Sequence, residues 1–328
     1  FFTENYGNKI IRSITKASRY FLENPPSCFK NVELMTKYGG SLFIANKHQS
    51  KLVDKELNYA KSLSANVFEI EKKEVLNMVP VIREEYLDRA LHEPDSKVMD
   101  VDLIHQGFAR GLKDNDGKII FNSEVQKIEK NNNLWKLITK NDEFFSPIVI
   151  NAAGAWCDEV SILAGCNSLN LAPKRRTVII FDHLKDINTS KWPVVIDIED
   201  NFYFKSEAGK ILASPADETD SPPCDSQPEE LDIALTIDRI ENATNFKIKN
   251  IDHKWSGLRS FFPDRTPVVG EDPSRSGFYW LAGQGGYGIQ TAPGISKIIE
   301  CLITGNNWPD YLYDLSITPE TLSPKRKI

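Results

Sequence analysis

The sequence lacks the cysteine and histidine patterns that bind metals. Its five cysteines include no C-x-x-C pair, and its five histidines show neither H-x-x-x-H nor H-x-H spacing. Structural zinc sites are built from such pairs, so we expect no metal site. An odd number of cysteines favours a reducing compartment, and we expect a cytoplasmic protein.

Long apolar runs and an excess of positive charge are also missing. No apolar run approaches the roughly 18 residues of a membrane-spanning helix. We therefore expect no integral membrane segment and leave open a peripheral contact with the inner membrane. With 40 basic and 46 acidic residues the formal net charge is −6, which disfavours a nucleic-acid-binding protein. What is present is a 328-residue chain, 41% hydrophobic, long enough for two domains with a sizeable core.

Hydrophobic residues recur with two periods along the chain. A period near 3.6 residues predicts helices over residues 8–23, 52–65, 71–78, 101–112, 229–245 and 291–304. Short apolar or alternating runs predict strands over 118–130, 134–140, 143–154, 174–182, 192–197, 201–205, 210–214, 266–270 and 277–282. The run over 143–154 is apolar throughout, as in a parallel strand covered on both faces. The order predicts an α/β (α+β) fold, in which a β-rich stretch on a mixed or antiparallel sheet interrupts an α/β domain.

A glycine loop near the C-terminus matches G-x-G-x-x-G. It spans 283–288, after an apolar strand and before a helix. A dinucleotide fingerprint also needs a second strand after the helix, ending in an acidic residue. We expect only an irregular polar tail after residue 305, so this interpretation is rejected. The helix N-terminus still suits an anion, with Pro293 in its first turn. The alternative is a tight turn whose glycines serve packing.

Three segments together carry a family resemblance. They are VINAAGAW at 149–156, WSGLRSF at 255–261 and GQGGYGIQTAP at 283–293. In this order and at these separations they resemble the D-amino-acid oxidase (DAO) superfamily of FAD-dependent oxidoreductases. Within it, the chain looks most similar to the bacterial D-amino-acid (D-arginine-type) dehydrogenases. The likeness extends over nearly the whole chain.

The resemblance implies a discontinuous architecture. The FAD-binding, Rossmann-like domain would comprise residues 1–30, 98–160 and 259–328, and the inserted substrate domain residues 31–97 and 161–258. The family's FAD site begins with an N-terminal strand and G-x-G-x-x-G helix, and this chain carries no such motif before residue 283. We therefore expect an N-terminally truncated FAD-binding domain.

The resemblance also implies a set of cofactor contacts. A valine in the family packs beside the adenine, small residues at a strand end admit the cofactor, and the glycine loop lines the flavin's pyrimidine edge. The positions that match are Val125, Ala153, Gly154, Trp156, Gly285, Gly286, Tyr287, Gly288, Ile289 and Gln290. From the residues alone, Val125 is equally an ordinary strand valine, and Ala153-Gly154 could serve close helix packing.

Four side chains match the family's substrate-binding residues. Arg259 matches an arginine that clamps the substrate carboxylate, and a planar guanidinium suits that contact. Strand alternation lets only one of Arg175 and Arg176 face inward, and the resemblance selects Arg176. Tyr203 matches a hydroxyl donor to the carboxylate, and Tyr6 a tyrosine near the substrate amine. Solvated arginines and hydrogen-bonded core tyrosines are the ordinary alternatives.

The implied activity is hydride transfer from the α-carbon of a (D-)amino acid to flavin N5. The imino acid product would hydrolyse to a keto acid and ammonia. One alternative is an oxidase of glycine- or sarcosine-type secondary amines. An alternative of another class is a truncated, non-catalytic remnant or interaction module. The partner is a small amino acid or amine, and the electron acceptor stays open between a quinone, a dye-type acceptor and O₂.

Overall fold

The computed structural model describes residues 1–62, 66–182 and 187–327. Its helices are α1 (Lys9–Glu23), α2 (Ser50–Ser62), α3 (Lys72–Met78), α4 (Val101–Asp114), α5 (Cys157–Leu163), α6 (Glu230–Ala243), α7 (Gly288–Thr304) and α8 (Asp310–Asp314), with the 3-10 turns η1 (Ser27–Phe29) and η2 (Gly154–Trp156). Its strands are β1 (Met35–Thr36), β2 (Ser41–Ala45), β3 (Phe68–Ile70), β4 (Arg89–Glu93), β5 (Val98–Met99), β6 (Val125–Asn131), β7 (Leu134–Thr139), β8 (Glu143–Ser146), β9 (Val149–Asn151), β10 (Ala172–Phe181), β11 (Val194–Asp197), β12 (Tyr203–Glu207), β13 (Lys210–Ser214), β14 (Thr219–Asp220), β15 (His253–Phe261), β16 (Val268–Glu271) and β17 (Phe278–Ala282). The predicted class, mixed α and β with mixed and antiparallel sheets, is confirmed.

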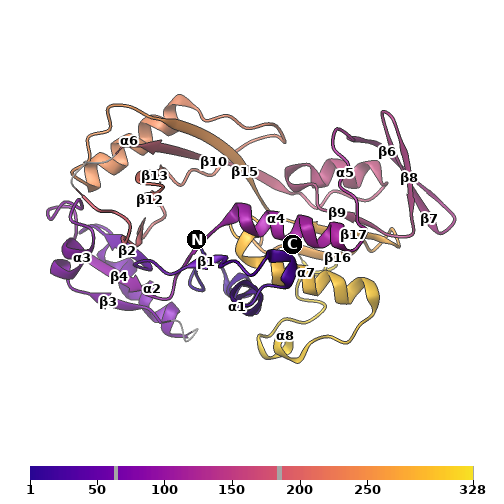
Figure 1. The fold of residues 1–328 in the computed structure, drawn as a ribbon, viewed down its shortest axis with the longest axis horizontal. Helices are drawn as coiled ribbons and strands as arrows, with labels where there is room; N and C mark the ends of the chain where they lie inside the picture. Colours follow the sequence, from indigo (N-terminus) through magenta and orange to yellow (C-terminus); the bar gives the residue numbers. More distant parts are fainter. Residues whose placement is uncertain (63–65, 183–186, 328) are drawn as a thin grey trace.

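A nine-stranded sheet forms one end of the molecule (Figure 1). Strand β10 has β15 along one edge and β13 and β14 along the other, all antiparallel. The sheet continues through β12 and β11 to β2, β4 and β3, and β2 and β11 pair in parallel. Helix α6 covers the β10–β13 region, and the largest apolar core lies beneath it. At the other end of Figure 1, β6, β7 and β8 form a separate antiparallel sheet.

A small sheet connects the two distant parts of the sequence that carry the family motifs. Strand β9 pairs in parallel with β17, which pairs antiparallel with β16. Helix α7 follows β17 and packs against α1, where Gly294 allows close approach: its N–H donates to Ser18 Oγ at 3.0 Å. A Cβ on Gly294 would lie 2.9 Å from that Oγ. The segments around residues 149–151 and 278–282, which lie far apart in the sequence, are therefore neighbours in one sheet.

Two strand predictions were wrong at their ends. The strand expected over 118–130 begins only at Val125, and residues 119–121 before it are exposed. The run over 143–154 divides at Pro147 into β8 and β9, which belong to different sheets. Proline supplies no N–H to a sheet ladder, so a strand readily ends there. Strand β9 is also an edge strand with Ile150 45% exposed, so it is not covered on both faces.

The C-terminal expectations need two corrections. Helix α7 begins at Gly288, which places Pro293 inside the helix rather than in its first turn. The tail after residue 305 is not irregular throughout, because α8 and buried Leu312, Ile317 and Leu322 pack beside α1 and α7. The apolar residues of this tail stand singly among polar ones, so the sequence shows no helical or strand periodicity there.

Strands β2, β4 and β15 had no sequence prediction. Strand β15 crosses the expected domain boundary between residues 258 and 259, and it continues from the large sheet toward the glycine loop. The division into FAD and substrate domains stays a proposal. Across the described residues, none of the helices combines the length and apolar character needed to cross a bilayer.

Candidate active site

The strand pair β10–β15 supplies the charged floor of the candidate site. In its register Lys174 lies opposite Arg259 and Arg176 opposite Gly257. Directly paired residues of an antiparallel sheet project from the same face, so Arg176 and Arg259 share a face. Gly257 leaves the space opposite Arg176 open, since a Cβ there would have no neighbour within 4 Å.

Arg175 projects from the opposite face, as strand alternation requires. There it forms an ion pair with Asp232 of α6 at 2.9 Å and a second with Glu229. Of the two adjacent arginines, the structure thus places Arg176 on the cavity side, and Arg175 serves helix packing.

A cavity of about 290 Å³ lies over the Arg176 face. It brings together six of the predicted site residues from five separate segments of the chain. They are Tyr6, Arg176, Tyr203, Arg259, Gly286 and Gln290. Tyr203 points away from the apolar core and into the cavity, because its chain neighbours Phe202 and Phe204 face that core.

The guanidinium groups in this cavity are poorly compensated. Across the described residues, Arg259 has no ion pair or side-chain hydrogen bond. Arg176 is 7% exposed, its Nε has no hydrogen-bond partner in the described part of the chain, and its Nη2 lies 3.4 Å from Glu218 Oε1. Burial and the neighbouring Arg259 lower the pKa of Arg176. Two cations with a single long contact to an acid between them favour the binding of an anion.

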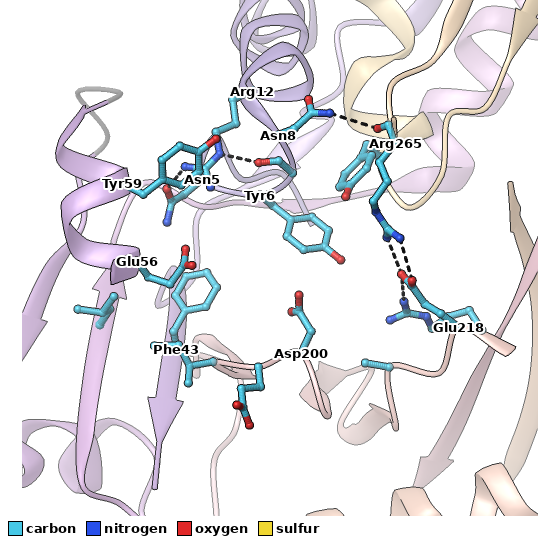
Figure 2. Close-up of a pocket in the computed structure, with 17 residues that line it drawn as sticks. Asn5, Tyr6, Asn8, Arg12, Phe43, Glu56, Tyr59, Asp200, Glu218 and Arg265 are labelled. Atoms are coloured by element: carbon cyan, nitrogen blue, oxygen red, sulfur yellow. Dashed lines mark hydrogen bonds and ion pairs between the residues drawn. The ribbon is translucent and has the colours of Figure 1, made fainter. Parts of the chain in front are cut away.

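A second, polar cavity of about 650 Å³ adjoins the first (Figure 2). It shares three lining residues with the smaller one: Tyr6, Arg176 and Asp200. The ring of Tyr6 contacts that of Tyr287 edge-on, with centroids 5.0 Å apart, and burial raises the Tyr6 pKa. Both tyrosines are therefore neutral across the physiological pH range.

Sequence reasoning missed Asp200, Glu218 and Arg265 at this site. Arg265 holds Glu218 in a bidentate pair, with bonds of 2.7 and 3.0 Å. Asp200 follows β11 in the turn that leads to β12. Its only sequence signal was a position three residues before Tyr203, and a turn aspartate alone predicts no role.

The glycine loop owes much of its composition to packing. A Cβ on Gly285 would lie 2.3 Å from the Phe261 ring, and one on Gly286 2.8 Å from Arg259 Nη1. The loop thus fits closely against the end of β15. Helix α7 begins without a side-chain cap, so the N–H groups of Gly288 and Ile289 are available to a ligand. Tyr287 is the N-cap residue of the helix, and its ring lines the larger cavity.

Both polar atoms of the Gln290 side-chain amide form hydrogen bonds within the protein. Its Oε1 accepts from the Thr3 N–H at 3.2 Å, and its Nε2 donates to Thr15 Oγ1 at 3.0 Å. The side chain ties the N-terminal segment, which carries Tyr6, to α7 and α1. Each amide atom keeps one further hydrogen-bonding position for a ligand.

The remaining predicted cofactor residues lie apart from the two cavities. Val125 and Ala153 pack against one apolar cluster around Trp280. Gly154 has a left-handed backbone (φ 59°), and a Cβ there would meet nothing within 4 Å. Trp156 is 42% exposed beside it. Gly154 and Trp156 are exposed just after the carboxyl end of β9, where open α/β sheets bind ligands, whereas Val125 and Ala153 are half-buried.

One protein-family model matches most of the chain. The model of the DAO family, described as FAD dependent oxidoreductase, matches residues 28–302. The chain belongs to this family of FAD-dependent oxidoreductases. FAD is the family's cofactor, and the family predicted from the three motifs is confirmed.

Individual relatives are distant. The chain is 25% identical over 196 residues to the uncharacterized oxidoreductase YurR of Bacillus subtilis, which covers 58% of this chain and 50% of the relative. It is 22% identical over 266 residues to human mitochondrial dimethylglycine dehydrogenase, covering 75% of this chain and 30% of the relative. The chain thus spans half or less of these relatives' length.

Among solved structures, glycine oxidase from Geobacillus kaustophilus superposes with a TM-score of 0.82 at 18% identity. The match covers 97% of this chain and 83% of that chain. At this identity the likeness shows the fold alone.

Proposed function

We propose that this FAD-family oxidoreductase oxidises the Cα–N bond of an amino acid or an N-substituted amino acid. One observation carries the proposal: Arg259 and Arg176 share a small cavity, and among the described residues their only acidic contact is the 3.4 Å one between Arg176 Nη2 and Glu218 Oε1. A substrate carboxylate would complete this pair. A charge-assisted, bidentate contact with Arg259 would fix the carboxylate plane, and the Tyr203 hydroxyl would donate to its free oxygen.

We propose that FAD contacts the described residues at two places. The uncapped start of α7 beside Gly286 would hold the flavin's pyrimidine edge, where helix N–H groups favour negative charge. Val125, Ala153, Gly154 and Trp156 would hold the adenosine part. When bound, FAD would supply the hydride acceptor. The chain's own residues would place the substrate α-carbon in front of it and exclude water around the arginines.

Two substrate classes follow. The resemblance to D-amino-acid dehydrogenases favours a D-amino acid with a free amine. The relatives named for glycine and dimethylglycine favour a glycine-type substrate, including secondary and tertiary amines. Both classes present a carboxylate to Arg259, so the arginine cavity accommodates either.

An anaerobic flavin-reduction assay decides between them. The FAD-loaded protein is mixed with D- and L-alanine, glycine, sarcosine and dimethylglycine, and the loss of oxidised-flavin absorbance is followed. We expect reduction by at least one carboxylate-bearing amine. Reduction by none of a broad panel, in a protein that holds FAD, would favour the non-catalytic alternative.

A further inference from the structure

Asp200 lies where the two cavities meet. Only Tyr6, Arg176 and Asp200 line both among the described residues. In Figure 2 the Asp200 carboxylate points into the larger cavity, toward the Tyr6 hydroxyl. The arginine cavity also has three cationic lining residues, Arg176, Lys205 and Arg259, against a single acid among its described residues, which is Asp200.

The carboxylate of Asp200 is unpaired, whereas its acidic neighbours are occupied. Asp197 accepts hydrogen bonds from Gln49, Asn201 and the Glu199 N–H. Glu218 is held by Arg265. Within the described residues Asp200 has no side-chain hydrogen bond or ion pair.

The turn fixes Asp200 in this place. Its N–H donates to the Asp197 carbonyl at 2.9 Å, and its backbone is left-handed, with φ 58°. An aspartate in this conformation carries some strain, which commonly marks functional positions. A rigid turn that aims an unpaired carboxylate into a cavity has no evident packing role.

The charges around Asp200 come from every side of the cavity. Arg176 faces it from β10, Glu218 from the segment before β14, Glu56 from α2, and Asp197 from its own turn. Asp200 is exposed to solvent at the cavities, and partial desolvation there raises its pKa to about 6, against the opposing pull of Arg176. Asp200 is ionised at neutral pH and able to take up a proton.

The chemistry of the proposed substrate requires a group of this kind. An amino acid bound with its carboxylate on Arg259 carries its cationic nitrogen one carbon away, within the same cavity. That nitrogen must lose a proton before its electron pair can assist oxidation of the Cα–H bond. A carboxylate near the nitrogen both attracts the cation and accepts the proton.

Resting on the proposed function, we propose that Asp200 holds the cationic amine of the substrate and accepts its proton. The N–H bond breaks with its electron pair left on nitrogen, and an O–H bond forms on Asp200. The proton then leaves to water in the larger cavity, which Asp200 also lines. Tyr6 lies beside this nitrogen and stays neutral.

A pair of unreactive ligands tests the first half of the proposal. Trimethylglycine and 3,3-dimethylbutanoate have the same shape and the same carboxylate, but only the first carries a positive charge. Their dissociation constants would be measured at pH 8 by calorimetry on the FAD-loaded protein. We expect wild type to favour trimethylglycine on the order of tenfold, which is the effect of about 1.4 kcal/mol, and Asp200→Asn to lose this preference. Asparagine also tolerates the left-handed backbone, so the variant keeps the turn.

Glu56→Gln is the matched control, because it removes one charge from the larger cavity without altering the junction. It should leave the preference within about twofold of wild type, since water screens a more distant charge. An equal loss in both variants would overturn the assignment to Asp200. Equal binding of the two ligands by wild type would also overturn it while leaving the proposed function intact. If neither ligand binds, both proposals fail.

The proton step has its own readout. At saturating substrate, flavin reduction should rise with pH up to the pKa of the bound amine in both proteins, because only the neutral amine can assist oxidation. Asp200→Asn should shift this rise to lower pH, since the variant lacks the carboxylate that stabilises the ammonium form. Identical pH profiles would overturn the contact between Asp200 and the substrate amine.

Discussion

The two faces of the β10–β15 strand pair differ in how far their arginine side chains are paired with acids. On the α6 face, Arg175 is fully paired with Asp232 and Glu229. On the cavity face, Arg176 has only a long contact with Glu218, and within the described residues Arg259 has no acidic partner. Buried charges are normally compensated because desolvation is costly. The uncompensated face is therefore the one that a ligand completes.

Removing Arg259 should have the largest effect. Losing one partner of a desolvated charge pair costs roughly 2–5 kcal/mol. Arg259→Ala should therefore lower kcat/KM for a carboxylate substrate by about 30-fold to several thousandfold. Arg259→Lys should recover only part, because an ammonium lacks the planar fork. An amine without a carboxylate is the control, and near-normal turnover of the carboxylate substrate combined with loss of flavin would show that Arg259 is structural.

Glu93 tests whether a buried acid without a cationic partner stays neutral. It is 4% exposed and bonded to the Thr3 hydroxyl, and burial raises its pKa to about 7. Because the folded pKa lies above the unfolded one, its contribution is complete below about pH 4.5 and is lost as pH rises through 7. The loss should reach roughly 3 kcal/mol. Glu93→Gln should flatten the pH dependence of urea unfolding between pH 5 and 8, and an unchanged slope would contradict the assignment.

Arg175→Met should separate the two faces. It leaves Asp232, 5% exposed, without its cation, and we expect a loss of roughly 1–3 kcal/mol in the free energy of unfolding. Ligand affinity should remain near wild type. Arg176→Met, its neighbour, should do the reverse and weaken carboxylate binding with little loss of stability. If both variants lost stability and binding equally, the distinction between the faces would be wrong.

The smallest expected effect comes from Gly286→Ala. The added Cβ would lie 2.8 Å from Arg259 Nη1, the flexible end of the side chain, so the guanidinium must shift. We expect KM for a carboxylate substrate to rise by about tenfold, the effect of roughly 1.4 kcal/mol, with kcat and thermal stability largely retained. Gly285→Ala is the contrast, because its left-handed backbone (φ 54°) and the Phe261 ring make the change a stability defect.

Most of the large elements could be predicted from the sequence, and the missed ones share a cause. Helix α1 carries a strong amphipathic period and ends at Glu23, with Asn24 as its C-cap before two prolines, as expected. Strand β15 escaped because its first half, HKWSG, is exposed and shows no alternation of apolar and polar residues. Its identity as a strand comes from pairing with residues 172–180 of β10. Pro147 was a signal for a break between two strands, but the apolar residues on both sides of it suggested a single continuous strand.

Within the candidate site, the sequence by itself determined the family, through three ordered motifs. It also determined that only one of Arg175 and Arg176 faces inward. The residues alone left the choice between the two arginines open and the resemblance favoured Arg176; the tertiary structure decided it, because Glu229 and Asp232 pair with Arg175 on the other side of β10. Only the tertiary structure also brought Asp200 between Tyr6 and Arg176, residues that lie far from it along the chain. A local pattern specifies which way a side chain points relative to its neighbours. What it meets there depends on segments that the local pattern does not contain.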